Sequence, residues 1–392
     1  MIKQANENLP MPVFEKVRYG PWQLEKMQPS QSIAASEDFQ EDFLGLKVTG
    51  STTTHQQLSP DLVAAGVLLM NIKQAYQEYP ELVKNMVGTV IGRQSDRLAA
   101  NNYDQFNTGF FLYIPANVQI EPVVQVVLNQ IADGQGDLIA RILVYVGENS
   151  QVKLLQRLQT LGNQASKASV VVEVLAQRGS RLTYANIDDF GPHTSAYINR
   201  QADVLANAQV DWVNASFNDG NTITRLASHV DGEGSISHAK VAAFTNRKQV
   251  QGFITEIQNS GRHSLGHIFQ RGVILNSSAL VFNGVGRIIK GAKGSDAQQE
   301  SRVLMLSRRG RGEANPLLLI DENDVTAGHA ASVGRVDEQQ LYYLMSRGLP
   351  EKVARKLVIR GFIGEVLSQM PTNQAQQDLI DAIERKLQYE RA

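Results

Sequence analysis

The chain of 392 residues contains no cysteine. This absence excludes disulfide bonds, thiolate zinc sites and a cysteine nucleophile, and it leaves the chain alone unable to hold a cysteine-ligated iron–sulfur cluster. Any metal site must therefore use His, Asp or Glu side chains.

Strong net charge and long apolar runs are also missing. The formal net charge is −1, so no overall field attracts nucleic acid or an anionic membrane. The longest apolar run, Leu62–Met70, is too short to span a bilayer, and the polar start MIKQANENLPMPVFEKV has no apolar core of a secretory signal. We therefore expect a soluble cytoplasmic protein with no membrane or nucleic-acid partner.

Residues 1–102 are expected to be mostly helical, with loops. Ser59 and Pro60 are typical of a helix N-cap and first helical position, and Pro80 predicts the start of another short helix. Near helical spacing also favours a helix for four apolar residues: Leu62, Val63, Val67 and Leu68. The segment 38–43 gives no clear indication.

Residues 103–334 show one apolar or alternating strand after another, separated by short turns. A small residue precedes an apolar strand opening by two positions at Ser150, Ser180, Ala208, Gly234 and Ser278. The first four recur at roughly constant period, which is typical of a solenoid whose rungs stack on one another. The pattern predicts a parallel β-helix; a β-sandwich gives similar strand counts but no long-period register.

Residues 335–392 change to helical periodicity. Asp337 and Gln340 have the spacing of a capping box, Gly348 is placed to end that helix, and Pro350 to begin the next. Two amphipathic helices follow, so the predicted order is helices, a long β-solenoid and a helical tail.

Few residues in the β region suggest chemistry. No P-loop, G-x-G-x-x-G or G-x-S-x-G motif is present. His263 and His267 would share a face if they lay on one strand, which allows a metal pair, but no third ligand is evident. The remaining candidates favour ordinary structural roles: His229 and His238 around a glycine-rich turn, the basic loop Ser307–Gly312, and the acidic pair Asp188 and Asp189.

His329 is the most interesting single residue. It lies in TAGHAAS, among small neighbours, at the junction expected between the last strand and the first C-terminal helix. Its ring either bonds a backbone carbonyl in a turn or faces a partner, and neutral imidazole is a metal ligand near pH 7.

The segment around His329 resembles a known signature. PLLLIDENDVTAGHAASVGRVDEQQLYYLMSRGL, residues 316–349, is similar to the C-terminal motif of the SufB/SufD family, scaffold components of SUF iron–sulfur cluster assembly. ARKLVIRGFIGEVL, FNGVGRIIKGAKGSDAQQESRVLMLS, LYIPANVQIEPVV and LPMPVFEKVRYGPW resemble further family segments. Gly286, Ser295 and Met305 depart from the second of these. Ala330, Gly334-Arg335 and the missing cysteine depart from the SufB type, which favours the cysteine-free branch of the family.

The resemblance implies a right-handed parallel β-helix between helical ends and a scaffold without independent catalysis. It implies pairing with a SufB-like paralogue through the edge of the β-helix, although the edge also allows a homodimer in isolation. It assigns His329 to iron or the nascent cluster at that interface. No cofactor is expected on the chain alone; the assembled complex would carry a transient iron–sulfur cluster, and a flavin there is left open.

The apolar side chains of the C-terminal helices allow two interpretations. The resemblance implies that they bind a SufC-type ABC ATPase, and a group of side chains at helical spacing forms the predicted partner surface: Tyr342, Leu344, Arg347, Leu349, Leu357 and Phe362. Alternatively, such residues cover the end of the solenoid, since solenoid ends need caps. Two other classes remain as alternatives for the whole chain, a carbohydrate-active β-solenoid enzyme and a structural polymer. An acidic cluster typical of the first is not apparent, and the second would not need the helical tail.

Overall fold

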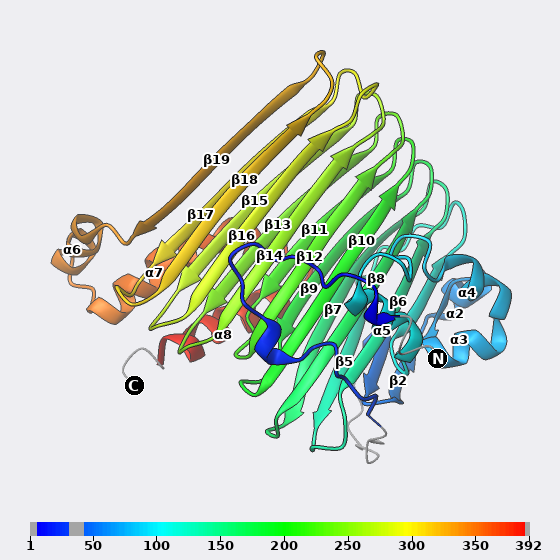
Figure 1. Cartoon of the computed structure of the whole chain (residues 1–392), viewed down its shortest axis with the longest axis horizontal. Coiled ribbons are helices and arrows are strands. Elements are labelled where there is room, and N and C mark those ends of the chain that lie inside the picture. Colours follow the sequence, from blue (N-terminus) through cyan, green and yellow to red (C-terminus); the bar gives the residue numbers. More distant parts are fainter. Residues whose placement is uncertain (1–5, 31–42, 389–392) are drawn as a thin grey trace.

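The computed structural model describes residues 6–30 and 43–388. Strands β4 to β19 wind as a solenoid of eight turns, because successive strands alternate between two sheets (Figure 1). Neighbouring solenoid strands within each sheet are parallel and in continuous register. The predicted parallel β-helix with helices at both ends is confirmed.

The two sheets have the following strands, given in spatial order. The ten-stranded sheet contains β19 (Thr326–Arg335), β17 (Asp296–Met305), β15 (Leu265–Ile274), β13 (Ile236–Thr245), β11 (Gln209–Ser216), β9 (Arg181–Asp189), β7 (Gln151–Gly162), β5 (Val124–Ala132), β1 (Gly45–Thr49) and β2 (Thr52–Gln57). The nine-stranded sheet contains β18 (Arg311–Ile320), β16 (Ala279–Ile288), β14 (Val250–Asn259), β12 (Asn221–Val230), β10 (Thr194–Val204), β8 (Ser166–Ala176), β6 (Leu138–Val146), β4 (Phe110–Ile114) and β3 (Leu68–Asn71).

One corner of the solenoid repeats a two-residue turn. A residue with positive φ precedes a small buried residue in Asn149-Ser150, Gly179-Ser180, Asn207-Ala208, Gly234-Ser235, His263-Ser264 and Gly294-Ser295. The left-handed conformation suits Gly and Asn, and the small residue fits the tight corner. The predicted series of small turn residues was therefore wrong at two positions. Ser235, not Gly234, is the small corner residue, and Ser278 lies directly before β16, a strand of the other sheet.

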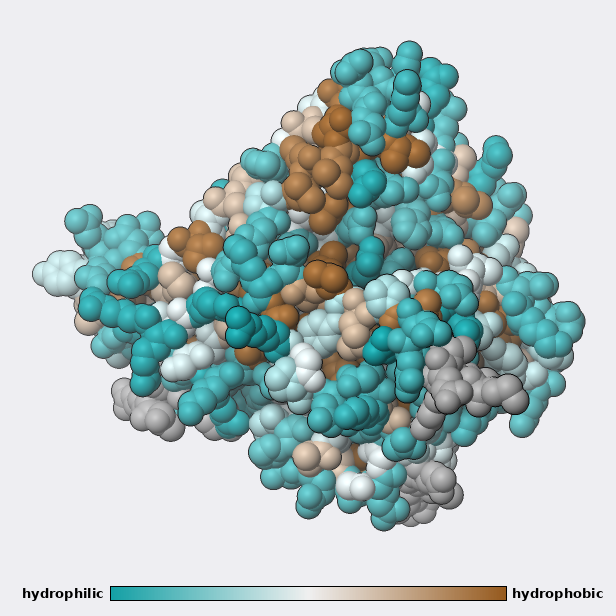
Figure 2. All heavy atoms as spheres, viewed as in Figure 1, coloured by the Kyte–Doolittle hydropathy of each residue, from teal (hydrophilic) through white to brown (hydrophobic). Residues whose placement is uncertain are grey.

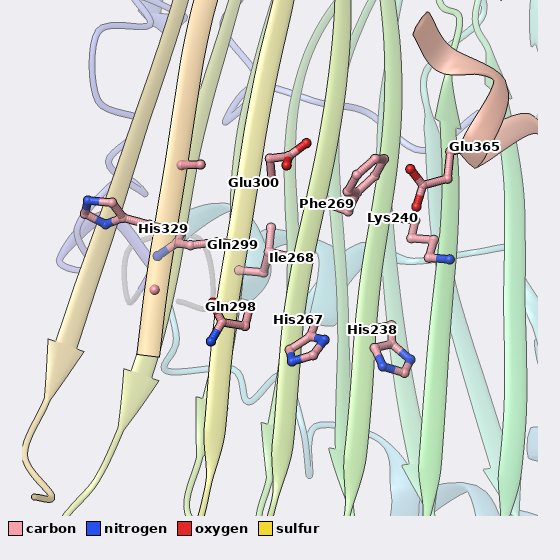
Figure 3. A pocket seen from close by; sticks show the side chains of 12 residues that line it. His238, Lys240, His267, Ile268, Phe269, Gln298, Gln299, Glu300, His329 and Glu365 are labelled. Carbon is pink, nitrogen blue, oxygen red and sulfur yellow. The ribbon is translucent and has the colours of Figure 1, made fainter. Parts of the chain in front are cut away.

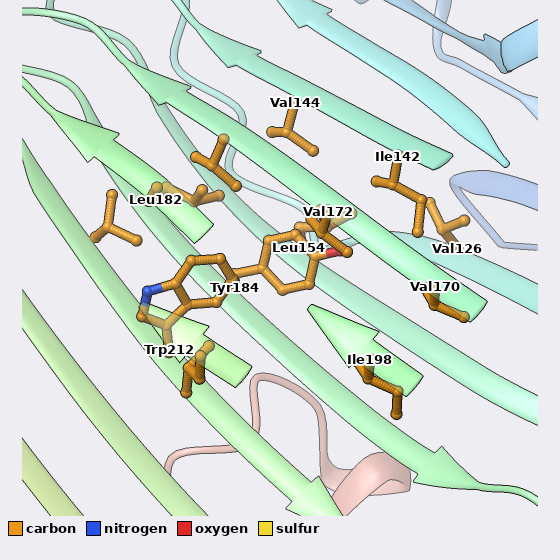
Figure 4. Close-up of a cluster of buried hydrophobic side chains, with 14 of the residues drawn as sticks. Val126, Ile142, Val144, Leu154, Val170, Val172, Leu182, Tyr184, Ile198 and Trp212 are labelled. Carbon is orange, nitrogen blue, oxygen red and sulfur yellow. The ribbon is translucent and has the colours of Figure 1, made fainter. Parts of the chain in front are cut away.

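The core fills the space between the two sheets. Inward side chains are mainly Val, Leu and Ile, and equivalent residues of successive rungs stack along the solenoid (Figure 4). Tyr184 and Trp212, one rung apart, have ring centroids separated by 5.1 Å. This continuous stacking explains the near-continuous apolar strands of the sequence, because each rung is buried by the rungs on both sides.

The N-terminal end of the solenoid is closed. Strand β2 adds antiparallel to β1, and β3 adds antiparallel to β4, so each sheet ends in a strand that breaks the parallel winding. Four helices accompany these strands: α2 (Pro60–Ala64), α3 (Ile72–Glu78), α4 (Pro80–Met86) and α5 (Arg97–Gln105). Helix α4 begins at Pro80 as predicted. The three strands were not predicted, and the helix expected through Val67 and Leu68 ends at Ala64, after which the chain turns into β3. The sequence offers no assignment for the segment 38–43, and residues 38–42 of it lie outside the described part of the chain.

The first described segment, residues 6–30, crosses the outer face of the nine-stranded sheet and includes the 3-10 turn η1 (Gly20–Trp22) (Figure 1). Phe14, Val17 and Tyr19 form an apolar cluster with side chains from several strands of that sheet. Near the far edge, Lys16 pairs with Glu313 of β18 at 2.7 Å, and Arg311 donates to the Lys16 carbonyl. The segment therefore ties β18 to earlier rungs.

The C-terminal region contains α6 (Glu338–Ser346), α7 (Glu351–Leu367) and α8 (Asn373–Gln388). The Asp337 side chain caps α6 by accepting from the backbone N–H groups of Gln339 and Gln340, and Gly348 follows the helix with φ 91°, as predicted. Within residues 6–30 and 43–388, no helix combines the length and apolar character needed to cross a bilayer.

Candidate functional site

The C-terminal end of the solenoid is open. Among the described residues, β19 and β18 are the last strands of their sheets, so each presents one unpaired edge. All residues of β19 except Gly328 are exposed, although the strand is fully paired to β17 on its other side. Apolar side chains also gather over the last strands on the face seen in Figure 2.

Comparison of register partners shows what this end lacks. Val333 of β19 is 39% exposed, whereas Val303, its partner one rung earlier, is 2% exposed. Ile320 of β18 is 36% exposed and its partner Ile288 is fully buried. A further layer of strands would cover Val333 and Ile320, just as the last rung covers their partners. This end of the solenoid therefore exposes apolar side chains and strand edges that are buried in interior rungs.

His329 lies at this open end. It is in the middle of β19, not at the junction between strand and helix, which corrects the prediction. Its register partner is Gln299, whose buried amide donates to the Leu317 carbonyl of β18 across the interior at 2.8 Å. Register partners in a parallel sheet point to the same face. The exposed His329 ring therefore faces the open lumen, and Figure 3 shows it directed away from the side chains on the outer face.

Helices α7 and α8 do not cover this end. Their apolar faces, including Ile359, Ile363 and Leu379, pack on the outer face of the ten-stranded sheet against Phe217, Phe244 and other residues. For α7 and α8, the alternative that the C-terminal helices cap the solenoid end is therefore wrong. Two ion pairs add to this contact: buried Lys386 with Asp219, and Arg157 with Asp378, each at 2.7 Å.

The predicted partner surface divides into two groups. Tyr342 and Leu357 are 72% and 44% exposed, and Arg347 is exposed with its guanidinium over the Tyr343 ring at 5.2 Å. Leu344, Leu349 and Phe362 are half-buried, and Phe362 packs against the apolar cluster beneath α7. Sequence reasoning missed exposed Tyr343 and Met345, because a strict helical stripe excludes adjacent positions. The group of Tyr342, Tyr343 and Met345 on α6 is called the α6 apolar surface below.

The other candidates from the sequence have structural partners. His263 is a turn residue with φ 54°, so it cannot share a strand face with His267, and that predicted pair is wrong. Asp188 is fully buried in an ion pair with Arg200, and Asp189 pairs with Arg385 of α8. Burial raises the pKa of Asp189.

Three histidines on strands each contact a carboxylate of a neighbouring rung. His229 bonds Asp203 through Nδ1 at 2.7 Å, and this hydrogen bond raises the pKa of His229. His238 bonds Asp211, and His267 bonds Asp296. His238 and His267 border a groove of about 570 Å³ on the outer face of the ten-stranded sheet, which extends from Glu365 of α7 to residues 328–330 of β19, His329 included (Figure 3). Among the described residues, no three His, Asp or Glu side chains converge as a metal site.

The fold and the open end define a class of protein: a β-solenoid closed at one end and unpaired at the other, with helices on one outer face. Comparisons with known proteins then identify the family. The model of the SUF system FeS cluster assembly, SufBD core domain, matches residues 129–362, and the model of the SufBD protein N-terminal region matches residues 43–126. The chain belongs to this SufB/SufD family, which confirms the resemblance found in the sequence.

Two relatives illustrate the similarity. The chain is 34% identical over 404 residues to the iron–sulfur cluster assembly protein SufD of Bacillus subtilis (strain 168). The aligned region covers 98% of this chain and 92% of that protein. It is 23% identical over 326 residues to an iron–sulfur cluster assembly SufBD family protein of Staphylococcus aureus (strain MRSA252), with 83% of this chain and 70% of that protein covered. The family is thus one whose named members act in iron–sulfur cluster assembly.

Proposed function

We propose that the chain is a non-catalytic scaffold subunit for iron–sulfur cluster assembly and works in the cytoplasm as part of a SUF complex. The observation that carries the proposal is the open end of the solenoid, where two edge strands and His329 lie exposed together. A scaffold needs a defined surface for a partner more than a completed catalytic pocket, and the open end supplies such a surface.

The partner we propose for the open end is a SufB-like paralogue. Parallel sheets bury both faces, and an unpaired edge strand readily adds another strand. A partner solenoid that continues β18 and β19 would satisfy their free backbone groups and bury Val333 and Ile320. A second copy of this chain offers the same surface, so a homodimer in isolation follows from the same chemistry.

His329 supplies one nitrogen ligand in this proposal. The chain has no thiolate, so iron or a nascent cluster bound at the interface takes its sulfur ligands from the partner. The imidazole of His329 faces the lumen that the partner would close, and imidazole is a suitable ligand for iron. The cluster is cargo here. We propose no resident cofactor for the chain alone. If the complex binds a flavin, we propose no residue of this chain as its ligand.

The second partner we propose is a SufC-type ABC ATPase, bound by the C-terminal helices. The α6 apolar surface is the favoured contact, because Tyr342, Tyr343 and Met345 are 72%, 56% and 40% exposed and α6 projects from the solenoid (Figure 1). Arg347 and Leu357 extend it. Half-buried Phe362 is a lesser candidate, since it already packs beneath α7.

Co-purification tests the complex. The tagged full chain would be co-expressed with a SufB-like paralogue and its ATPase and examined by native mass spectrometry. We expect Val333→Asp to remove the paralogue but keep the ATPase, and Tyr342→Asp combined with Tyr343→Asp to do the reverse. If neither variant alters the composition of the complex, both assigned surfaces are wrong.

Cluster formation tests His329 separately. In a reconstituted complex, His329→Ala should lower the yield of iron–sulfur cluster while the complex stays assembled. Visible absorbance measures that yield. His229→Ala is the matched control, because it removes a strand histidine distant from the open end. Equal yields for wild type and His329→Ala would refute the ligand role.

A further inference from the structure

The outer face of the ten-stranded sheet carries a second arrangement of histidines that the scaffold role does not use. His238 on β13 and His267 on β15 are register partners on adjacent strands, with ring centroids 5.6 Å apart and planes tilted by 52°. Both side chains are about one-third exposed at the groove defined above. Figure 3 shows the two rings side by side and well separated from His329.

Each ring is held by a carboxylate on the side away from the other ring. Asp211 lies on β11, beyond His238, and accepts from His238 Nδ1 at 2.7 Å. Asp296 lies on β17, beyond His267, and accepts from His267 Nε2 at 3.3 Å. The strand order is β11, β13, β15, β17, so the four residues form a row of carboxylate, imidazole, imidazole, carboxylate.

This row leaves one nitrogen of each ring on the side away from its carboxylate, toward the neighbouring ring. They are Nε2 of His238 and Nδ1 of His267, and neither has a hydrogen-bond partner within residues 6–30 and 43–388. In the neutral form of each ring, a carboxylate at the outer nitrogen favours the N–H there and leaves the lone pair on the inner nitrogen. Metal-bound histidines typically have this second bond to a carboxylate, which orients the ring and raises its basicity.

The spacing suits a shared ion. Two imidazoles bound to one tetrahedral ion, with Zn–N distances of about 2.0–2.1 Å, have ring centroids roughly 5–6 Å apart. We propose that His238 and His267 form a two-histidine site for a divalent transition metal of borderline softness, such as Zn²⁺ or Fe²⁺. Water completes the coordination, because no third His, Asp or Glu converges there among the described residues. Binding is therefore exchangeable.

The site is independent of the proposed scaffold function. The His329 side chain faces the lumen at the open end, although the residue also borders the groove, whereas the histidine pair lies on the outer face. Either assignment can fail without the other. His229 and Asp203 provide an internal control, because they form the same kind of His–Asp contact at 2.7 Å, and no second histidine ring of the described residues lies beside it.

The test is equilibrium binding of Zn²⁺ alone to the metal-free full chain, measured by calorimetry at pH 7.5, with Co²⁺ absorption as a second readout of nitrogen coordination. We expect one ion per chain, lost in both His238→Ala and His267→Ala and retained in His229→Ala and His329→Ala. Asp211→Asn and Asp296→Asn should weaken binding by about 10–100-fold, the usual effect of removing such a carboxylate. Circular dichroism would confirm that each variant is folded.

Two outcomes overturn the proposal. One is the absence of stoichiometric binding in the wild type. The other is binding that survives removal of either ring, which would place the ion elsewhere. Repetition with Fe²⁺ under anaerobic conditions then shows whether the same pair takes iron.

Discussion

Glu173 of β8 gives the strongest test of how the N-terminal region is attached to the solenoid. Its carboxylate is 1% exposed and accepts from three backbone N–H groups, those of Gly88, Val90 and Ile91, at 2.9–3.0 Å. It also receives two bonds from the buried Arg141 guanidinium, at 2.9 and 2.6 Å. Glu173→Ala removes all five contacts and leaves a fully buried cation without its partner.

The expected cost follows from burial. Breaking a buried ion pair from one side typically costs about 3–5 kcal/mol, because the remaining charge is desolvated and uncompensated. Glu173→Gln keeps one acceptor and should cost less, about 1.5–3 kcal/mol, for the lost charge-assisted bonds. The matched control is Glu256→Ala, which breaks the partly exposed pair with Arg225 and should cost about 0–1 kcal/mol.

Urea denaturation measures the change in unfolding free energy, and hydrogen exchange locates it. The amides of residues 88–91 should exchange much faster in Glu173→Ala, while those of the central strands keep their protection if the loss is local. If Glu173→Ala costs no more than Glu256→Ala and exchange at residues 88–91 is unchanged, the carboxylate does not hold this segment.

Three further predictions concern the open end, a pH effect and a turn. Val303→Asp should unfold the solenoid, whereas Val333→Asp, at the exposed equivalent position, should change stability by less than about 0.5 kcal/mol by urea denaturation; equal losses would mean that the end is not open. His229 has a raised pKa, so its bond to Asp203 stabilises the fold below the unfolded pKa of 6.5, and this contribution is lost as pH rises through the folded pKa. His229→Ala should therefore lower Tm more at pH 5.5 than at pH 9, by an amount worth less than about 1 kcal/mol at this exposure; a loss that is larger at pH 9 would contradict the assignment. His263→Gly should leave the protein at least as stable, since Gly adopts the observed positive φ without cost, and a large loss of stability would reveal a role beyond the turn.

The solenoid could be predicted from the sequence because each rung has the same structural requirements. Every rung needs a tight corner and an inward apolar strand, so the same signal recurs along the chain and a single misplaced residue, such as Gly234 for Ser235, does no harm. The N-terminal strands have no such support. β3 has four residues and follows a good helix start at Ser59, and its strand conformation is decided by antiparallel pairing with β4, which local sequence does not contain.

His329 was misplaced for a related reason. Strands are recognised by β-branched and aromatic residues, and TAGHAAS around His329 has almost none. Backbone pairing to β17 makes this segment a strand, and the open lumen leaves little for bulky side chains to pack against. The histidine pair escaped notice because His238 and His267 meet only through rung register. Once a solenoid period is known, histidines one period apart with flanking aspartates are the signal to seek.

The position of His329 on an edge strand bears on its proposed role as a metal ligand. Within the described part of the chain, β19 is paired on one side only, so we expect the geometry around His329 to be less restrained than in an interior rung. Pairing with a partner would fix the strand on both sides and close the lumen at the same moment. If His329 is a ligand as proposed, coordination there would become competent only on assembly, and a redox-active metal would not bind to the unpaired subunit at this position. In the proposed pairing, burial of the exposed Val333 and Ile320 would supply apolar driving force, so the interface and the ligand geometry would form together.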